Sequence, residues 1–330
     1  MGIIKDSLYL LSGKPLLRFF KSQPVFPYYH IVRNHAVPHI KNLYEYKNID
    51  RFNEDLDFLM ANYSPINPLS LFEGNIPDNG FLLTFDDGLA EVYSVIFPIL
   101  KQRGLSAIVF VNPNFVDNQK SLYKHDISLI IENLQKNPDL GLMKKVADIL
   151  AVDYTSRRDL FTKLKNTKYS DRHKIKEILA FIGISIDSFL EKEQPYITKA
   201  QIHEMIREGF YFGGHTMSHP PLRQLSFEEQ KAEIIESVQW VKDHFGLKYS
   251  AFAFPFSDKK MPRVLFDTMF EYDPKMLVFG NSGIKKDIDR RIIQRFSLEN
   301  PAKKSSRVIV AENLYKQFNK FTGQYQIKRK

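Results

Sequence analysis

Short apolar runs alternate along the chain with longer stretches in which hydrophobic residues recur at helical spacing. The apolar runs predict strands at residues 25–32, 80–85, 106–111, 210–212, 249–254, 276–279 and 291–296. Helical spacing predicts helices over residues 51–62, 89–103, 198–209, 226–245 and 305–318. Because strands and helices alternate, we expect an α/β protein with a parallel sheet and helices outside it, either open or closed into a barrel.

Residues 116–196 interrupt this alternation. Their apolar residues recur at helical spacing, as Ile130 and Leu134 do, and no strand pattern occurs among them. We therefore expect a helical insertion at 116–196 within a main body of residues 25–330, preceded by a separate N-terminal segment of residues 1–24.

The N-terminal segment contains an apolar stretch that Lys5, Asp6 and Lys14 interrupt. It lacks the uninterrupted apolar core and the cleavage site of a signal peptide. We expect this segment to pack on the protein, with contact to a membrane surface as the alternative. No later stretch is long enough to cross a bilayer, so we expect a cytoplasmic protein, with peripheral membrane association as the alternative.

The composition limits the available chemistry. The chain has 330 residues, of which 43% are hydrophobic, which is enough for one large unit with a sizeable core. Its net charge is +9, but the basic residues are spread along the chain and no nucleic-acid-binding motif occurs, so no nucleic-acid partner is expected. Because the sequence contains no Cys, any metal ion must be bound by His, Asp or Glu.

Two adjacent carboxylates, Asp86 and Asp87, follow the predicted strand at residues 80–85, and Gly88 permits a sharp turn after them. Neighbouring carboxylates repel each other, and a divalent cation on one of them relieves the repulsion. A solvated Asp-Asp-Gly turn is the simpler interpretation of this motif taken alone.

A pair of histidines, His215 and His219, follows the predicted strand at residues 210–212. Residues four apart share a face if the stretch forms one helical turn, and both imidazoles then reach one metal ion. The preceding Gly213 and Gly214 allow a close approach of the backbone. With nine His in the chain, one such pair is also expected by chance.

The two motifs together indicate more than either does alone, because the carboxyl ends of parallel strands meet at one edge of the sheet or barrel. Two His and one Asp form a common catalytic metal site, and the second Asp can then act as a general base on a water molecule. A non-haem iron oxygenase uses the same ligand types, but those enzymes usually have a β-sandwich barrel, which the α/β pattern does not favour.

The sequence Thr84-Phe-Asp-Asp-Gly88 and the sequence His215-Thr-Met-Ser-His219 resemble the first two motifs of the polysaccharide deacetylase family, carbohydrate esterase family four. The order of the motifs and the strand before each also agree. The resemblance covers about residues 25–115 and 197–300 and omits the helical insertion.

Two shorter matches accompany these motifs. Ala253-Phe-Pro-Phe256 is similar to the third motif of the family, which forms a wall of the substrate groove. Tyr29-His30 resembles a Tyr-His pair found in many members, including deacetylases of β-linked glucosamine polymers. The resemblance therefore predicts a groove lined by Pro255, Phe256 and Tyr29.

The resemblance also implies a fold, an activity and a site. The fold is a distorted (β/α) barrel of seven or eight strands. Asp86 is implied as the general base, and Asp87, His215 and His219 as ligands of a divalent metal ion, usually zinc, with cobalt, nickel and iron known in the family. The implied reaction removes N-acetyl groups from an amino-sugar polysaccharide or glycan, or O-acetyl groups in some branches.

Two departures from the family pattern leave alternatives open. Ala253 stands where the third motif often has the Arg that steadies the base, and the family's late Leu-x-His, which supplies the general acid, has no match because the last histidine is His244. His30 is our candidate for the general acid, with a structural role as the alternative. A non-catalytic glycan-binding protein on the same fold therefore remains an alternative function, as does an O-acetyl esterase.

Overall fold

Eight short parallel strands form the central sheet of the computed structural model, which describes residues 3–20 and 23–330. The strands are β1 (Pro27–Tyr29), β4 (Leu83–Phe85), β5 (Ala107–Val111), β6 (Tyr211–Gly214), β7 (Ala251–Ala253), β8 (Leu277–Gly280), β9 (Ile292–Gln294) and β10 (Phe296–Ser297). Their order across the sheet is β10-β1-β4-β5-β6-β7-β8-β9.

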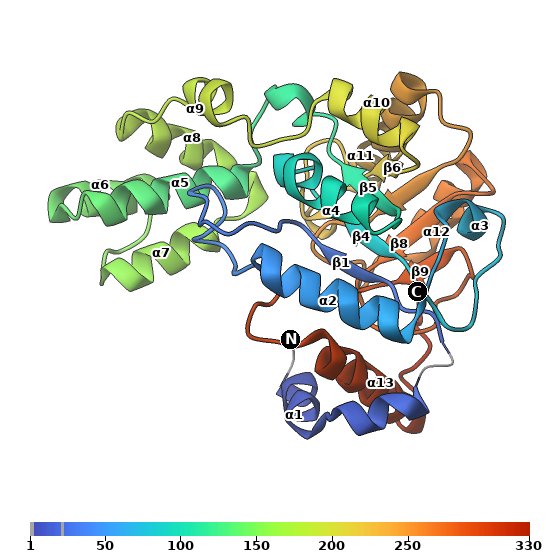
Figure 1. Ribbon diagram of the computed structural model, residues 1–330. Coiled ribbons are helices and arrows are strands. Elements are labelled where there is room, and N and C mark those ends of the chain that lie inside the picture. Colours follow the sequence, from blue (N-terminus) through green and yellow to red (C-terminus); the bar gives the residue numbers. More distant parts are fainter. Residues whose placement is uncertain (1–2, 21–22) are drawn as a thin grey trace.

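The two outer strands of this sheet, β9 and β10, are separated in sequence by the single residue Arg295. At this point the chain leaves β8 and joins β1, because the Arg295 amide donates to the Gly280 carbonyl and the Phe296 amide donates to the Phe26 carbonyl. The sheet therefore curves into a nearly closed barrel of eight strands, which confirms the predicted (β/α) barrel (Figure 1).

Helices surround the barrel, and their ends follow the expected sequence signals. They are α2 (Ile49–Asn62), α3 (Pro68–Phe72), α4 (Phe97–Gln102), α10 (Lys199–Arg207), α11 (Phe227–Phe245), α12 (Arg263–Tyr272) and α13 (Ser305–Phe321). Thr198 and Ser226 form capping boxes at the starts of α10 and α11. Pro98 lies in the first turn of α4, which a π-helical turn, η2 (Val92–Ile96), precedes, so the helix predicted over 89–103 restarts at the proline.

The strand predicted over residues 80–85 is divided between two sheets. Its first part, β3 (Gly80–Phe81), pairs with β2 (Ser64–Pro65) outside the barrel, and its second part is β4. The prediction of one continuous strand was therefore wrong, because an uninterrupted apolar run does not reveal which neighbours its backbone will pair with.

The segment between β5 and α10 is helical, as expected. It contains α5 (Tyr123–Lys136), α6 (Leu140–Leu150), α7 (Arg157–Lys165), α8 (Arg172–Phe181) and α9 (Ile186–Glu193). These helices form a lobe beside the barrel (Figure 1), with a hydrophobic core that also includes Ile31 and Leu89 of the barrel.

The N-terminal residues form α1 (Ile3–Leu11) and a 3₁₀ helix, η1 (Lys14–Phe19), both of which pack against α13. Figure 1 shows α1 at an edge of the molecule, with α13 between it and α2. Within the described residues, none of the helices has the length and apolar character needed to cross a bilayer.

Candidate active site

A cavity of about 350 Å³ opens at the carboxyl ends of the barrel strands. Five of its lining residues come directly after a strand: His30 after β1, Asp86 after β4, His215 after β6, Phe254 after β7 and Asn281 after β8. The helical lobe contributes part of the opposite wall, including Lys124 of α5. The parallel strands thus bring together residues that lie far apart in the sequence.

Asp87, His215 and His219 form a buried cluster in this cavity. One atom from each can be chosen such that all three lie within 4.8 Å of one another. The Asp87 Oδ1 atom lies 3.1 Å from the His219 Nε2 atom and 3.4 Å from the His215 Nε2 atom. This geometry fits a single divalent cation, and it brings together the three residues that the sequence suggested as ligands.

Hydrogen bonding orients one of these imidazoles for metal binding. The His215 Nδ1 atom donates to the Ala253 carbonyl at 2.8 Å, so its Nε2 atom is left as the lone-pair donor facing Asp87. The Asp87 Oδ1 atom is buried and has no conventional hydrogen-bond partner in the structure. A buried carboxylate oxygen in this state is costly unless a cation compensates it.

The histidines do not share a helical turn, and that part of the sequence argument was wrong. The residues after β6 form an irregular loop, in which Thr216 and His219 adopt positive φ angles of 67° and 54°. The Thr216 Oγ1 atom accepts from the His219 amide at 3.0 Å, and the Asn112 side chain donates to the Thr216 carbonyl at 3.0 Å. These bonds stabilise the turn that returns His219 to the cluster.

The glycines of both motifs are required by space and backbone conformation. Gly88 has a φ of +58°, and a Cβ atom there would lie 3.0 Å from a Val111 methyl group. A Cβ atom on Gly213 would lie 2.6 Å from the Ala251 carbonyl oxygen, and one on Gly214 would meet the Ser237 side chain at 2.5 Å. The glycines therefore allow β6 to pack closely against β7 and α11.

Asp86 is held by Arg295, a residue that the sequence argument did not identify. The guanidinium donates two hydrogen bonds to the Asp86 carboxylate, at 2.7 Å and 2.9 Å, and a third to the Thr84 hydroxyl at 2.9 Å. Burial by itself raises the pKa of Asp86, but the Arg295 charge and hydrogen bonds outweigh burial and lower that pKa below its usual value. Asp86 is therefore a carboxylate at neutral pH.

Arg295 contacts Asp86, although Ala253 stands where the third motif of the family often has an arginine. Its side chain is fully buried at the seam between β9 and β10 and lies among the rings of Tyr28, Phe110 and Phe279. The only sequence signal was a charged residue inside the apolar run at 291–296.

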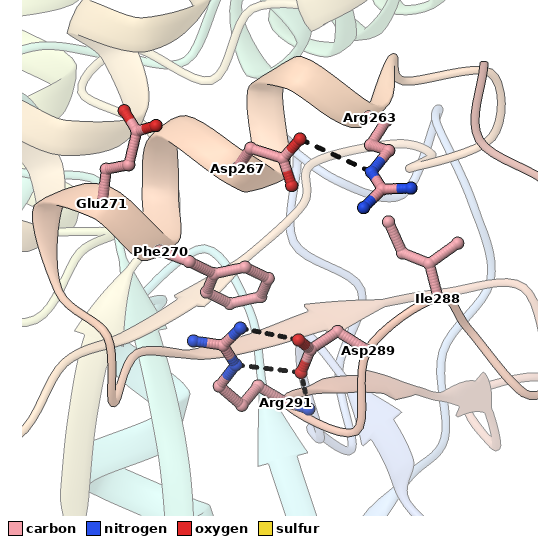
Figure 2. Close-up of a pocket in the computed structure, with 7 residues that line it drawn as sticks. All are labelled: Arg263, Asp267, Phe270, Glu271, Ile288, Asp289 and Arg291. Carbon is pink, nitrogen blue, oxygen red and sulfur yellow. Dashed lines mark hydrogen bonds and ion pairs between the residues drawn. The ribbon is translucent and has the colours of Figure 1, made fainter.

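Replacing Arg295 by Met is expected to lower the free energy of unfolding by about 3–5 kcal/mol, because the buried Asp86 carboxylate loses its partner. Urea denaturation at neutral pH measures this change. The exposed ion pair between Arg263 and Asp267 (Figure 2) provides the matched control, and Arg263→Met should cost less than about 1 kcal/mol. Equal losses in the two variants would show that Arg295 does not compensate a buried charge.

His30 lies in the same cavity and is paired with Glu299, a second residue that the sequence argument missed. Its Nδ1 atom lies 2.7 Å from the Glu299 carboxylate, which also accepts from the amides of His30 and Ile31 at 2.9 Å and 3.0 Å. Burial alone lowers the pKa of His30, but the Glu299 charge and hydrogen bond outweigh it and raise that pKa to about 10. His30 is thus an imidazolium whose Nε2 atom is not bound to Glu299.

Two of the predicted groove residues occupy other positions. Tyr29 is fully buried and its hydroxyl donates to Asp55 at 2.7 Å, whereas Tyr28 lines the cavity. Neighbouring residues of a strand point to opposite sides, so the prediction selected the wrong member of the pair. Phe256 does line the cavity and is 49% exposed, whereas Pro255 is buried and is not part of the lining.

His125 also lines the cavity, but its surroundings disfavour the imidazolium form. It is 1% exposed, its Nδ1 atom lies 2.8 Å from the Tyr196 hydroxyl, and burial lowers its pKa well below the usual value. His30 is therefore the better candidate for a proton donor.

A separate depression lies between α12 and the residues that precede β9 (Figure 2). Two ion pairs lie in it, between Arg263 and Asp267 and between Arg291 and Asp289. It shares no lining residue with the cavity that holds Asp86 and Asp87. This depression therefore contributes nothing to the cluster of candidate catalytic groups.

Comparison with solved structures supports the fold. The deacetylase PplD of Streptococcus pyogenes aligns with a TM-score of 0.55 at 17% identity, covering 89% of this chain and 97% of that protein. IcaB of Ammonifex degensii aligns with a TM-score of 0.52 at 18% identity, covering 88% and 97%. The polysaccharide deacetylase BC0361 of Bacillus cereus aligns with a TM-score of 0.52 at 13% identity, covering 88% and 70%.

Comparison of sequences identifies the family. No curated protein matches the chain significantly. The family model described as polysaccharide deacetylase matches residues 73–128 and 163–272, which together make up half of the chain. These ranges contain Asp86 and all three residues of the cluster. The chain belongs to the polysaccharide deacetylase family, whose members are hydrolases of amide or ester bonds that remove acetyl groups from carbohydrates.

Proposed function

We propose that this protein is a metal-dependent hydrolase that removes N-acetyl groups from an amino-sugar polysaccharide or glycan. The observation that carries the proposal is the buried cluster of Asp87, His215 and His219, with the Asp86 carboxylate next to it in the same cavity. A cation site, a base and a proton donor within one cavity are the groups that amide hydrolysis needs.

The donor set supports zinc, although cobalt, nickel or iron would also suit two imidazoles and one carboxylate. Asp87, His215 and His219 would bind the ion, and the buried Asp87 Oδ1 atom that has no hydrogen-bond partner would be compensated. When bound, the ion lowers the pKa of a coordinated water molecule and polarises the acetyl carbonyl group.

Asp86 would act as the general base. It would take a proton from the attacking water, and its own low pKa keeps it ionised for this purpose at neutral pH. Arg295 is a positioning residue in this scheme, because its two hydrogen bonds fix the plane of the carboxylate.

His30 would act as the general acid. The Glu299 carboxylate holds its Nδ1 atom, which leaves the Nε2 proton for the nitrogen of the departing amino sugar. This arrangement supplies the proton donor that the missing Leu-x-His motif would have provided, and it favours catalysis over the alternative of a glycan-binding protein without activity.

Replacing Glu299 by Gln is expected to move the alkaline limb of the pH profile of kcat/KM to lower pH by about 1–3 units. The acid must be protonated to work, so activity falls as pH rises through the His30 pKa. Glu299 raises that pKa to about 10, and loss of its charge lowers it. Glu312→Gln, which removes a buried carboxylate paired with Lys5, is the control. An alkaline limb that stays in place in Glu299→Gln would remove His30 from this role.

Substrate choice separates N-deacetylation from O-deacetylation. The zinc-loaded protein should release acetate and expose primary amines on a partly acetylated glucosamine polymer, with slower release from O-acetylated xylan. Faster release from xylan would favour an O-acetyl esterase, and tight binding of either polymer without any release of acetate would favour the non-catalytic alternative.

Phe256 is exposed at the rim of the cavity beside His219, with the two ring centroids 4.7 Å apart, and is placed to contact a sugar ring.

The iron oxygenase alternative has no support from the parallel barrel, which is a different fold from the β-sandwich barrels that those enzymes use. Cytoplasmic location remains a prediction from the sequence, as does the absence of a nucleic-acid partner.

A further inference from the structure

The first helix presents several large apolar side chains to solvent while polar contacts hold it on the protein. On the inner side, Lys5 forms an ion pair of 2.6 Å with the buried Glu312 of α13. Arg307 of α13 donates to the carbonyl oxygens of Tyr9 and Leu10 at the end of the helix, at 2.9 Å and 2.8 Å. Polar contacts thus help to hold α1 on α13, together with Tyr9, which packs against the hydrophobic core.

The exposed side chains of α1 include three large apolar ones, beside the polar Asp6 and Ser7. Leu10 is 75% exposed, Leu11 is 73% exposed and Ile4 is 48% exposed. At 100° per residue, Ile4 and Leu11 project in nearly the same direction, and Leu10 lies on the other side of the outward face. Moving such side chains from water into a lipid interface lowers the free energy of the system.

The carboxyl end of α13 carries two more exposed apolar side chains. Phe321 is 92% exposed and Phe318 is 42% exposed, with the exposed Lys320 between them in sequence. The ion pair between Lys5 and Glu312 shows that α1 and α13 run side by side. We call Ile4, Leu10, Leu11, Phe318 and Phe321 the terminal apolar patch.

The segments that carry this patch have an excess of basic residues. Residues 1–20 and 301–321 contain 8 Lys and Arg against 2 Asp and Glu, which gives +6 of the net charge of +9. The basic tail that follows them lies elsewhere, because the buried Arg329 pairs with Asp258 and Asp287 and the Lys330 carbonyl accepts from the Arg263 amide of α12.

We propose that the terminal apolar patch docks this protein on an anionic lipid bilayer. Exposed Leu and Phe side chains beside an excess of Lys and Arg are the two features that a peripheral protein uses at such a surface. A second copy of the chain would bring the same positive charge to the contact and be repelled. An acidic polysaccharide would satisfy the lysines but leave the apolar side chains in water. This proposal is independent of the reaction at the cavity.

Sedimentation of the full-length protein with lipid vesicles tests the proposal. Vesicles containing phosphatidylglycerol should bind the protein, vesicles of phosphatidylcholine alone should bind it much less, and about 0.5 M salt should weaken the binding by screening the charges. Leu10→Ser/Leu11→Ser should reduce the apparent affinity by about tenfold or more. The control is Leu140→Ser, which changes a 54% exposed leucine on α6 and should bind like the wild type.

A second variant guards against an effect of Leu10→Ser/Leu11→Ser on folding. Lys304→Gln/Lys320→Gln changes two exposed side chains, and it should weaken binding to the anionic vesicles while leaving the weak binding to neutral vesicles unchanged. Lack of binding to anionic vesicles would overturn the proposal. An equal loss in Leu140→Ser would do so too, as would a wild-type dimer that Leu10→Ser/Leu11→Ser converts to a monomer, because the patch would then be a contact between copies.

Discussion

Replacing Asp86 by Asn is expected to slow acetyl release by about 10²–10⁴-fold, which is the usual contribution of a positioned general base. The amide has the size of the carboxylate, so Arg295 keeps an acceptor, but it cannot take a proton from water. The change should appear in kcat. It should leave the stoichiometry of bound zinc unchanged, because Asp86 is bound to Arg295 and is not one of the three clustered ligands.

The matched control for this variant is Asp57→Asn. Asp57 is an exposed carboxylate that also accepts from an arginine, Arg103, and its loss should leave the rate of acetyl release unchanged. Full activity in Asp86→Asn would contradict the assignment of the base. Loss of zinc together with activity would instead make Asp86 part of the metal site.

Removal of the metal ion is expected to abolish activity. After treatment with a chelator, the wild-type protein should release no acetate, and added zinc should restore the rate. Asp87→Asn should not recover at the same zinc concentration, because it lacks the only carboxylate of the cluster, and a neutral amide oxygen is a much weaker ligand. Calorimetric titration of the apoprotein with zinc measures the affinity directly.

The control for the metal experiment separates a loss of ligands from a loss of folding. Thermal unfolding of the wild type should shift to higher temperature when zinc is added, because an ion that binds only the folded state stabilises it. Asp87→Asn should fold but show a much smaller shift. Undiminished acetate release from the chelated protein would refute metal dependence.

The sequence was sufficient to predict that Asp87, His215 and His219 lie together, because parallel strands impose their own geometry. Asp87 and His215 each follow a short apolar run, and the carboxyl ends of such strands converge in any parallel barrel. This convergence depends on the order of the strands and helices and not on their exact ends. The prediction therefore held although residues 80–85 are divided between β3 and β4.

The residues that support the site were harder to predict, because they depend on how the barrel closes. Arg295 and Glu299 reach Asp86 and His30 only because β10 returns to pair with β1. A sequence pattern shows an apolar run there but does not indicate that the chain crosses from one edge of the sheet to the other at a single residue.

Errors of one residue also follow from physical causes. Tyr28 and Tyr29 are both aromatic, so the sequence does not reveal which of them faces the cavity, and a shift by one residue reverses the side of a strand. One helical turn from His215 to His219 was the arrangement that their spacing alone suggested for reaching one ion. Instead, positive φ angles at Thr216 and His219 produce the return of the chain.

Crystals of the zinc-loaded protein, measured at the zinc absorption edge, test the central claim most directly. A single strong anomalous peak should lie within bonding distance of Asp87, His215 and His219, with the Asp86 carboxylate facing the same space. A peak at another site, or a loaded crystal without any peak in this cluster, would contradict the proposed hydrolase.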